Sequence, residues 1–168
     1  MAKRSDSAQR SFISYIDRTR EYYRALGYEE PYRWAHFDDV PFARLQAPLA
    51  GSRLTVVTTA EPWRGNAGTS AQGTRSVWSG PTDAPPERLY TDALAWDKDV
   101  THTDDVGSFL PIAALQGFAA SERIGALAER FHGVPTDYSQ RRTLERDAPE
   151  ILGRCREDGV DAALLVPL

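Results

Sequence analysis

The chain has 168 residues, of which 41% are hydrophobic and 26% are charged, and its 24 acidic residues exceed its 20 basic ones for a net charge of −4. This surplus of acid excludes bulk electrostatic attraction to nucleic acid or to an anionic membrane surface. No apolar run approaches the roughly 18 residues that a membrane helix needs, and a single cysteine, Cys155, excludes an internal disulfide framework. The composition therefore predicts a globular, cytoplasmic protein.

The first 52 residues are expected to form a helix followed by an irregular arm. From Gln9 to Leu26, apolar side chains recur at helical spacing, and Gly27 suits the position just past a helix end. Residues 28–49 then carry three prolines and five aromatic residues, a composition that does not suit a single helix. The sequence therefore predicts an arm in this stretch rather than a second helix.

Residues 53–168 are expected to form an α/β domain. Arg53 to Thr59 is rich in β-branched residues, and its adjacent valines predict a strand that is buried on both faces. Glu61 to Glu87 is rich in glycine and proline and predicts a long loop.

Within this predicted loop, residues 65–73 lack the Gly-Lys-Ser/Thr sequence of a phosphate loop, so no nucleotide cofactor is expected. Residues 88–92 predict a short strand.

The middle of this domain predicts one helix and one strand. Pro111 to Ile124 carries apolar residues at helical spacing, and the helix is expected there. Ala126 to His132 predicts a short strand. The histidine at its end is expected to hydrogen-bond a loop.

The C-terminal third has the clearest periodicity. A stripe of apolar residues at helical spacing predicts a core-facing helix surface, and its members are Leu144, Ala148, Ile151, Leu152 and Cys155. Asp147 and Glu150 resemble a capping box around Pro149, which predicts that the helix restarts at Asp147. Gly159 is expected to end the helix, and Val160 to Leu168 predicts a nearly continuous apolar strand.

Strands that are apolar on both faces and alternate with helices predict an α/β fold. We expect a single domain with a largely parallel, Rossmann-like sheet flanked by helices. In such sheets, ligand sites form outside the carboxyl ends of the strands. A site is therefore expected beyond the end of the last strand.

Residues 97–105 hold the densest cluster of ionisable side chains. His102, with Asp104 and Asp105 close by, is suited to general acid–base chemistry or to contact with a substrate. The alternative is a solvated loop in which these side chains make local caps. The cluster contains no second histidine or cysteine, so a metal site is not expected. Cys155 lies on the apolar stripe and is expected to be a buried, unreactive thiol.

Three segments in this order resemble the selenoprotein B family, whose members are components of the glycine, sarcosine, betaine and D-proline reductases. The segments are RLTVVTTA at 53–60, DKDVTHTDDVGSFLPIAALQGFAASERIGALA at 97–128, and APEILGRCREDGVDAALLVPL at 148–168. They match a strand with a Val-Thr-Thr end, a His/Asp-rich loop leading into a helix, and a helix that runs through Asp-Gly-Val-Asp-Ala into an apolar strand.

The resemblance implies a reductase component that uses a thiol or selenol to reduce a small amine or amino-acid derivative. In the family, a selenocysteine or cysteine, two residues and a second cysteine follow the last of these strands, and the selenolate displaces the amine. The resemblance places this centre just after Leu168, so residues 53–168 are expected to be incomplete at their C-terminus. It also implies that the loop with His102, Asp104 and Asp105 lies near this end and contacts the substrate. Thiol or selenol reductase proteins would be partners.

Two other functions remain open from the sequence. One is a non-catalytic subunit of the same fold that binds a small molecule or a partner. The other is a hydrolase or metal enzyme that uses His102 with Asp104 or Asp105. The sequence does not indicate an oligomeric state.

Overall fold

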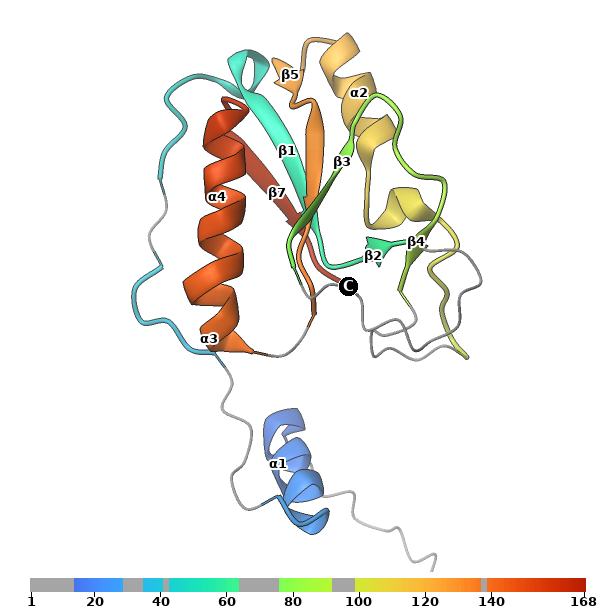
Figure 1. Cartoon of the computed structure of the whole chain (residues 1–168), viewed down its shortest axis with the longest axis vertical. Coiled ribbons are helices and arrows are strands. Elements are labelled where there is room, and N and C mark those ends of the chain that lie inside the picture. The colour runs from blue at the N-terminus through green and yellow to red at the C-terminus, as the bar shows by residue number, and fades with distance from the viewer. Residues whose placement is uncertain (1–13, 29–34, 41–42, 64–75, 92–98, 137–138) are drawn as a thin grey trace, which may run out of the picture. The chain divides into compact units, whose positions relative to one another are not determined.

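The computed structural model describes residues 14–28, 35–40, 43–63, 76–91, 99–136 and 139–168. The chain divides into two compact units, Met1–Pro41 and Phe42–Leu168. Figure 1 shows both units, and each is described by itself below.

The helix of the first unit is α1, Tyr15–Ala25, which confirms the predicted helix over its described part. Residues 9–13 of that prediction lie outside the described residues. The Ser14 hydroxyl accepts a hydrogen bond from the Asp17 backbone N–H at 3.3 Å and caps the N-terminus. Gly27 has a φ of +87° just past the C-terminus, a conformation that glycine adopts without steric cost.

The main sheet of the second unit is mostly parallel, as predicted. Its central strand, β1 (Arg53–Thr58), pairs with β7 (Ala162–Val166) along one side. On its other side, β1 pairs with β5 (Ala126–Leu127) and then with β6 (Arg130–Gly133). All four strands are parallel, and β3 (Trp78–Pro81) adds an antiparallel strand beside β6.

The register of the sheet shows that β5 and β6 act as one interrupted strand. Leu54 lies opposite Leu127, whereas Val57 lies opposite His132, so two additional residues are accommodated between the two pairings. This break divides the single strand that was predicted from Ala126 to His132. Both halves still run alongside β1.

A smaller pair of strands and one helix complete this part of the chain. β2 (Glu61–Pro62) pairs antiparallel with β4 (Leu89–Tyr90). α2 spans Ile112–Ala120, a shorter helix than predicted. Short 3₁₀ turns, η1 and η2, lie at Leu49–Gly51 and Val106–Ser108.

The region predicted as one long loop contains regular structure. β2 and β3 both lie within residues 61–87, so the loop prediction is wrong at these positions. The sequence of β3 is Trp-Ser-Gly-Pro, which lacks the β-branched residues that usually indicate a strand. Proline is tolerated there because β3 has no partner on its other side among the described residues. Residues 64–75, which include most of the glycine-rich stretch, lie outside the described residues.

The C-terminal helical region runs without interruption from α3 (Gln140–Arg142) through a π-helical turn (η3, Thr143–Asp147) into α4 (Ala148–Glu157). Asp147 has helical backbone angles and its side chain makes no capping hydrogen bond, so the predicted capping box and restart are wrong. The wider π-turn precedes Pro149, which cannot donate to a regular helical ladder. The turn therefore accommodates the proline within one continuous helix.

The two longer helices of this unit cover opposite faces of the main sheet (Figure 1). On the α2 face, Val56 and Phe131 join a buried core with Phe109, Ile112 and Leu115. The Trp78 and Phe131 rings meet edge to face, with centroids 5.3 Å apart. Val57 and Ala163 lie on the other face, where they line a cleft with Ile151, Leu152 and Cys155 of α4.

The C-terminal helical region and the strand β7 are more exposed than the sequence suggested. Leu144 and Leu152 are 58% and 49% exposed, so the predicted core-facing stripe is wrong at both, although Cys155 is buried. Leu165 of β7 is 69% exposed. Within the described residues, the sheet ends at β7, and no further strand lies beyond it to cover these side chains. Gly159, with a φ of +63°, ends α4 as predicted.

Candidate functional site

The carboxyl ends of the parallel strands meet at one edge of the sheet. β1 ends at Thr58 and β7 ends at Val166, two residues that lie opposite each other in the register. Beyond them, the Leu168 backbone N–H donates to the Thr59 hydroxyl oxygen at 2.9 Å. In open parallel sheets this edge is where ligands bind, so it is the first candidate site.

The loop that carries the predicted site residues leads into η2. His102 Nδ1 lies 3.6 Å from Asp104 Oδ2, and these side chains are 74% and 90% exposed. Asp105 accepts from the Gly107 backbone N–H at 2.9 Å and so caps η2. The structure therefore brings the exposed side chains of His102 and Asp104 close together, while the Asp105 carboxylate caps the η2 turn. This geometry is compatible with both interpretations of the loop, as a solvated segment with local caps and as a segment whose exposed side chains contact a ligand.

One hydrogen bond fixes this loop to the body of the unit. The hydroxyl groups of Thr91 and Thr103 are 2.6 Å apart, and Thr91 directly follows β4. Residues 97 and 98 of the predicted cluster lie outside the described residues. Among the residues that are described, no three histidine, cysteine, aspartate or glutamate side chains are grouped so that they could hold a metal ion.

A second cluster of polar side chains lies on the α4 face of the sheet. Ser79 of β3 and His132 of β6 are register partners, and Ser79 Oγ is 2.8 Å from His132 Nδ1. Arg154 of α4 donates from Nη1 to Ser79 Oγ at 2.6 Å and from Nη2 to the Val77 carbonyl at 3.3 Å. Adjacent strands and the helix above them thus bring a hydroxyl, an imidazole and a guanidinium together.

These contacts limit the protonation of the pair without assigning the tautomer of His132. A guanidinium can only donate, so Arg154 occupies one lone pair of the Ser79 oxygen, and the proton between Ser79 Oγ and His132 Nδ1 lies on the serine in one histidine tautomer and on the imidazole in the other. His132 Nε2 is a buried atom without a hydrogen-bond partner in the described part of the chain. Burial lowers the pKa of His132, and the positive charge of Arg130 lowers it further, so the ring is held neutral.

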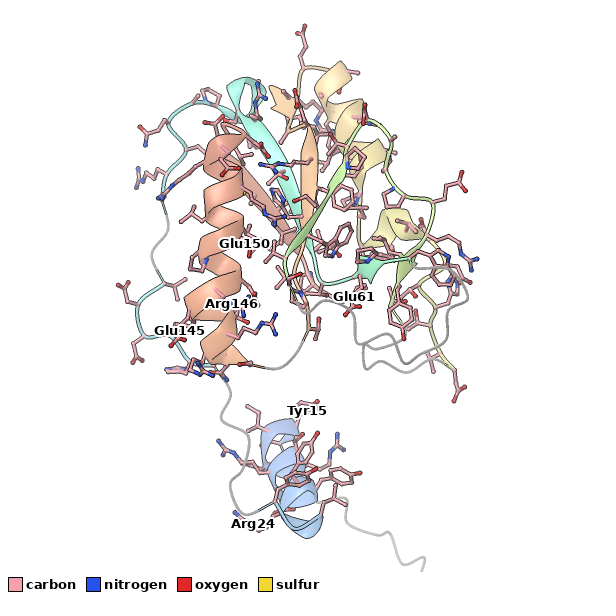
Figure 2. The ribbon with its side chains drawn as sticks, in the orientation of Figure 1. Tyr15, Arg24, Glu61, Glu145, Arg146 and Glu150 are labelled. Atoms are coloured by element: carbon pink, nitrogen blue, oxygen red, sulfur yellow. The ribbon has the colours of Figure 1, made fainter. Side chains whose placement is uncertain are left out.

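Ion pairs surround this cluster, one within α4 and two between β6 and the C-terminal end of α4. Arg154 Nη2 lies 2.5 Å from Glu150 Oε1, and Figure 2 shows Glu150 on the side of α4 that faces the strands. Arg130 donates from Nε to Asp158 at 2.7 Å and from Nη2 to Glu157 at 2.9 Å. The hydrogen bond from Arg130 lowers the pKa of Asp158. The cluster borders a surface depression of about 750 Å³.

The single thiol is not part of either site. Cys155 is 8% exposed, and burial raises its pKa, so the reactive thiolate is disfavoured. This confirms the prediction of a buried thiol.

Sequence reasoning missed the roles of Ser79 and Arg154. It placed Ser79 in a loop and gave Arg154 no role. His132 was expected to end a strand and to hydrogen-bond a loop; it lies one residue before the end of β6, and its partner belongs to another strand. Recognition of β3 as a strand would have revealed the pair, because Ser79 and His132 then face each other.

Comparisons with protein-family models, with curated proteins and with solved structures find no match. The expectation of a similarity to the selenoprotein B reductases therefore rests on the three sequence segments alone.

Proposed function

We propose that this chain is the substrate-binding scaffold of a reductase component similar to selenoprotein B. A small amine or amino-acid derivative binds at the carboxyl ends of β1 and β7, with His102 and Asp104 as contacting groups. A thiol or selenol group reduces the bound substrate. The observation that carries the proposal is the hydrogen bond between Leu168 and Thr59, because it joins the ends of the two strands at the edge where the family pattern places its redox centre.

The chemistry of the loop suits a zwitterionic substrate. An exposed carboxylate such as that of Asp104 can accept hydrogen bonds from an ammonium group, and His102 can donate to a carboxylate or exchange a proton. The geometry of the two side chains leaves them open to solvent and therefore accessible to a ligand. The position of this loop relative to Leu168 remains part of the proposal.

The reducing group is not Cys155. A thiol reacts as its thiolate, and the burial of Cys155 disfavours that form and removes it from contact with a substrate. In the family pattern the reducing group follows the strand that corresponds to β7. The other source of the reducing group is a partner reductase that carries a reactive thiol or selenol.

Isothermal titration calorimetry with glycine, sarcosine, betaine and D-proline tests the binding step. We expect one of these ligands to bind, and we expect His102→Ala to weaken binding by about tenfold or more, since a hydrogen bond to a charged group contributes about 1.5–3 kcal/mol. The matched control is His36→Ala. His36 is also exposed and lies 3.0 Å from an aspartate, Asp38, but belongs to the first unit.

The absence of binding for all four compounds would contradict the proposed substrate class. An equal loss of affinity in the His102 and His36 variants would contradict the proposed role of His102. Cleavage of the substrate's C–N bond, measured with a partner reductase that supplies the thiol or selenol, separates the reductase from the second candidate, a non-catalytic binding subunit. That candidate is favoured by one observation, the burial of the single thiol, and it predicts binding without cleavage.

A further inference from the structure

The cluster of Ser79, His132 and Arg154 has no part in the proposed reductase chemistry, yet it contains a hydroxyl group with a base beside it. We propose that Ser79 is a nucleophile for acyl transfer from a small uncharged ester, with His132 as the general base and Arg154 as the group that orients the hydroxyl. The proposal is independent of the reductase function, and it concerns the α4 face of the sheet rather than the edge at the carboxyl ends of β1 and β7.

The geometry of the pair is that of an activated hydroxyl. Ser79 Oγ lies 2.8 Å from His132 Nδ1 and accepts from Arg154 at 2.6 Å; in the tautomer with the imidazole proton on Nε2, the hydroxyl donates to Nδ1. An adjacent base within hydrogen-bonding distance is the usual means of activating a serine. Burial lowers the pKa of His132, so the imidazole is uncharged near neutral pH, and in this tautomer Nδ1 carries the lone pair that accepts the Ser79 proton.

The side chain of Ser79 is accessible to a ligand. Ser79 is half-buried and lines the depression of about 750 Å³ beside α4. Two arginines and two glutamates line the same depression, so the charges there balance and an uncharged ligand is favoured. The lining residues are Val77, Trp78, Ser79, Arg130, Glu150, Gly153, Arg154 and Glu157.

The ladder between β3 and β6 also provides a donor for the developing oxyanion. The Thr82 backbone N–H donates to the Glu129 carbonyl at 2.9 Å, so this pair is hydrogen-bonded, and bonded and non-bonded pairs alternate along an antiparallel ladder. Three positions earlier, Ser79 and His132 therefore form a non-bonded pair. The Ser79 N–H consequently points away from β6, toward the side of β3 on which no strand pairs with it among the described residues, where it can donate to an ester oxygen. Serine nucleophiles often use their own backbone N–H in this way.

The reaction needs no further reagent than water. Ser79 Oγ bonds to the ester carbonyl carbon while its proton moves to His132 Nδ1. The tetrahedral intermediate then expels the alcohol, which takes the proton from His132 and leaves an acyl group on Ser79. Water, deprotonated by the same imidazole, displaces the acyl group as a carboxylic acid and restores the serine.

The test uses a small fluorophosphonate, which forms a stable covalent adduct with activated serines, and intact-mass spectrometry of the full chain. We expect one adduct per chain, mapped by peptide analysis to Ser79 and absent from Ser79→Ala. The control is Ser121→Ala, in which an exposed serine at the end of α2 is removed, and we expect this variant to be labelled as the parent is.

A second measurement tests the base. His132→Gln keeps a side chain that can hydrogen-bond but cannot take up the proton, and we expect its labelling rate to fall at least tenfold. Arg154→Lys, which keeps the charge at a solvent-accessible position, provides a folded variant with a disturbed Ser79 hydrogen bond and is expected to be labelled more slowly. Circular dichroism checks that each variant is folded. Absence of an adduct on the folded parent at saturating probe, or labelling that persists in Ser79→Ala, would overturn the proposal.

Discussion

Replacing Gly133 with alanine tests the packing of β3 against β6, on which the second cluster depends. Gly133 is the last residue of β6 and lies opposite Trp78. A Cβ atom at Gly133 would lie 1.9 Å from Trp78 Nε1 and 2.2 Å from Trp78 Cε2. Because these distances are far below van der Waals contact, the indole must move.

The magnitude of the effect follows from two contributions. Insertion of a methyl group into a closely packed site costs about 1–3 kcal/mol. Movement of the indole also breaks the 3.2 Å hydrogen bond from Trp78 Nε1 to the Ala60 carbonyl, which has a net value of about 0.5–1.5 kcal/mol. We therefore expect Gly133→Ala to lower the free energy of unfolding by about 1.5–4.5 kcal/mol, a large fraction of the 5–15 kcal/mol typical of a domain.

Urea denaturation followed by tryptophan fluorescence measures this change. The matched control is Gly117→Ala, because a Cβ atom at Gly117 in α2 has no atom within 4 Å. Alanine has the higher helix propensity, so this second substitution should stabilise the protein by about 0.5–1 kcal/mol. An unchanged unfolding free energy for Gly133→Ala would refute the packing of Trp78 over β6.

Three further predictions concern single side chains. Cys155 should react with a thiol reagent only slowly in the native protein, and Cys155→Ala should lower the free energy of unfolding by about 1 kcal/mol, as measured by urea denaturation. His132 has a lowered pKa in the folded state, so the unfolded chain binds more protons at this residue than the folded protein does. The free energy of unfolding should therefore fall as the pH drops below about 6.5. Thermal melts of a His132→Gln variant should show a smaller loss of stability over the same pH range. Arg130→Ala removes the bonds to Asp158 and Glu157 and should lower the free energy of unfolding by about 1 kcal/mol, less so in high salt.

The sequence predicts elements whose side chains have a clear periodicity. β1 is identified by its β-branched residues, and the C-terminal helix by its spacing of apolar residues, which also places Cys155 on the buried side. Gly27 and Gly159 mark helix ends because their positive φ angles favour glycine. The mostly parallel pairing follows from the alternation of strands and helices.

Features that depend on the neighbours of an element are not predictable in this way. The apolar strand β7 has the composition of a buried strand, but it pairs only with β1 among the described residues, and Leu165 is therefore exposed. β3 has a glycine and a proline where a strand pattern requires other residues, and its position is determined by β6 and by the fit of Phe131 against Gly80. Tertiary packing overrides local propensity at both strands.

The same reason explains which site residues the sequence could predict. His102, Asp104 and Asp105 are close in sequence, so their clustering was visible without a structure, and the local bond between His102 and Asp104 follows from it. Ser79, His132 and Arg154 are distant in sequence and come together only through strand pairing and the packing of α4. Their contacts require the fold to be known.

The proposed site for a small amine or amino-acid derivative lies at the carboxyl ends of β1 and β7. Nuclear magnetic resonance of the ¹⁵N-labelled protein, titrated with glycine, sarcosine, betaine and D-proline, detects binding there residue by residue. We expect one ligand to shift the amide signals of Thr59, Leu168 and His102 together, along a single saturable curve. Shifts that are confined to other residues, or no shift with any of the four ligands at saturating concentration, would rule out this site.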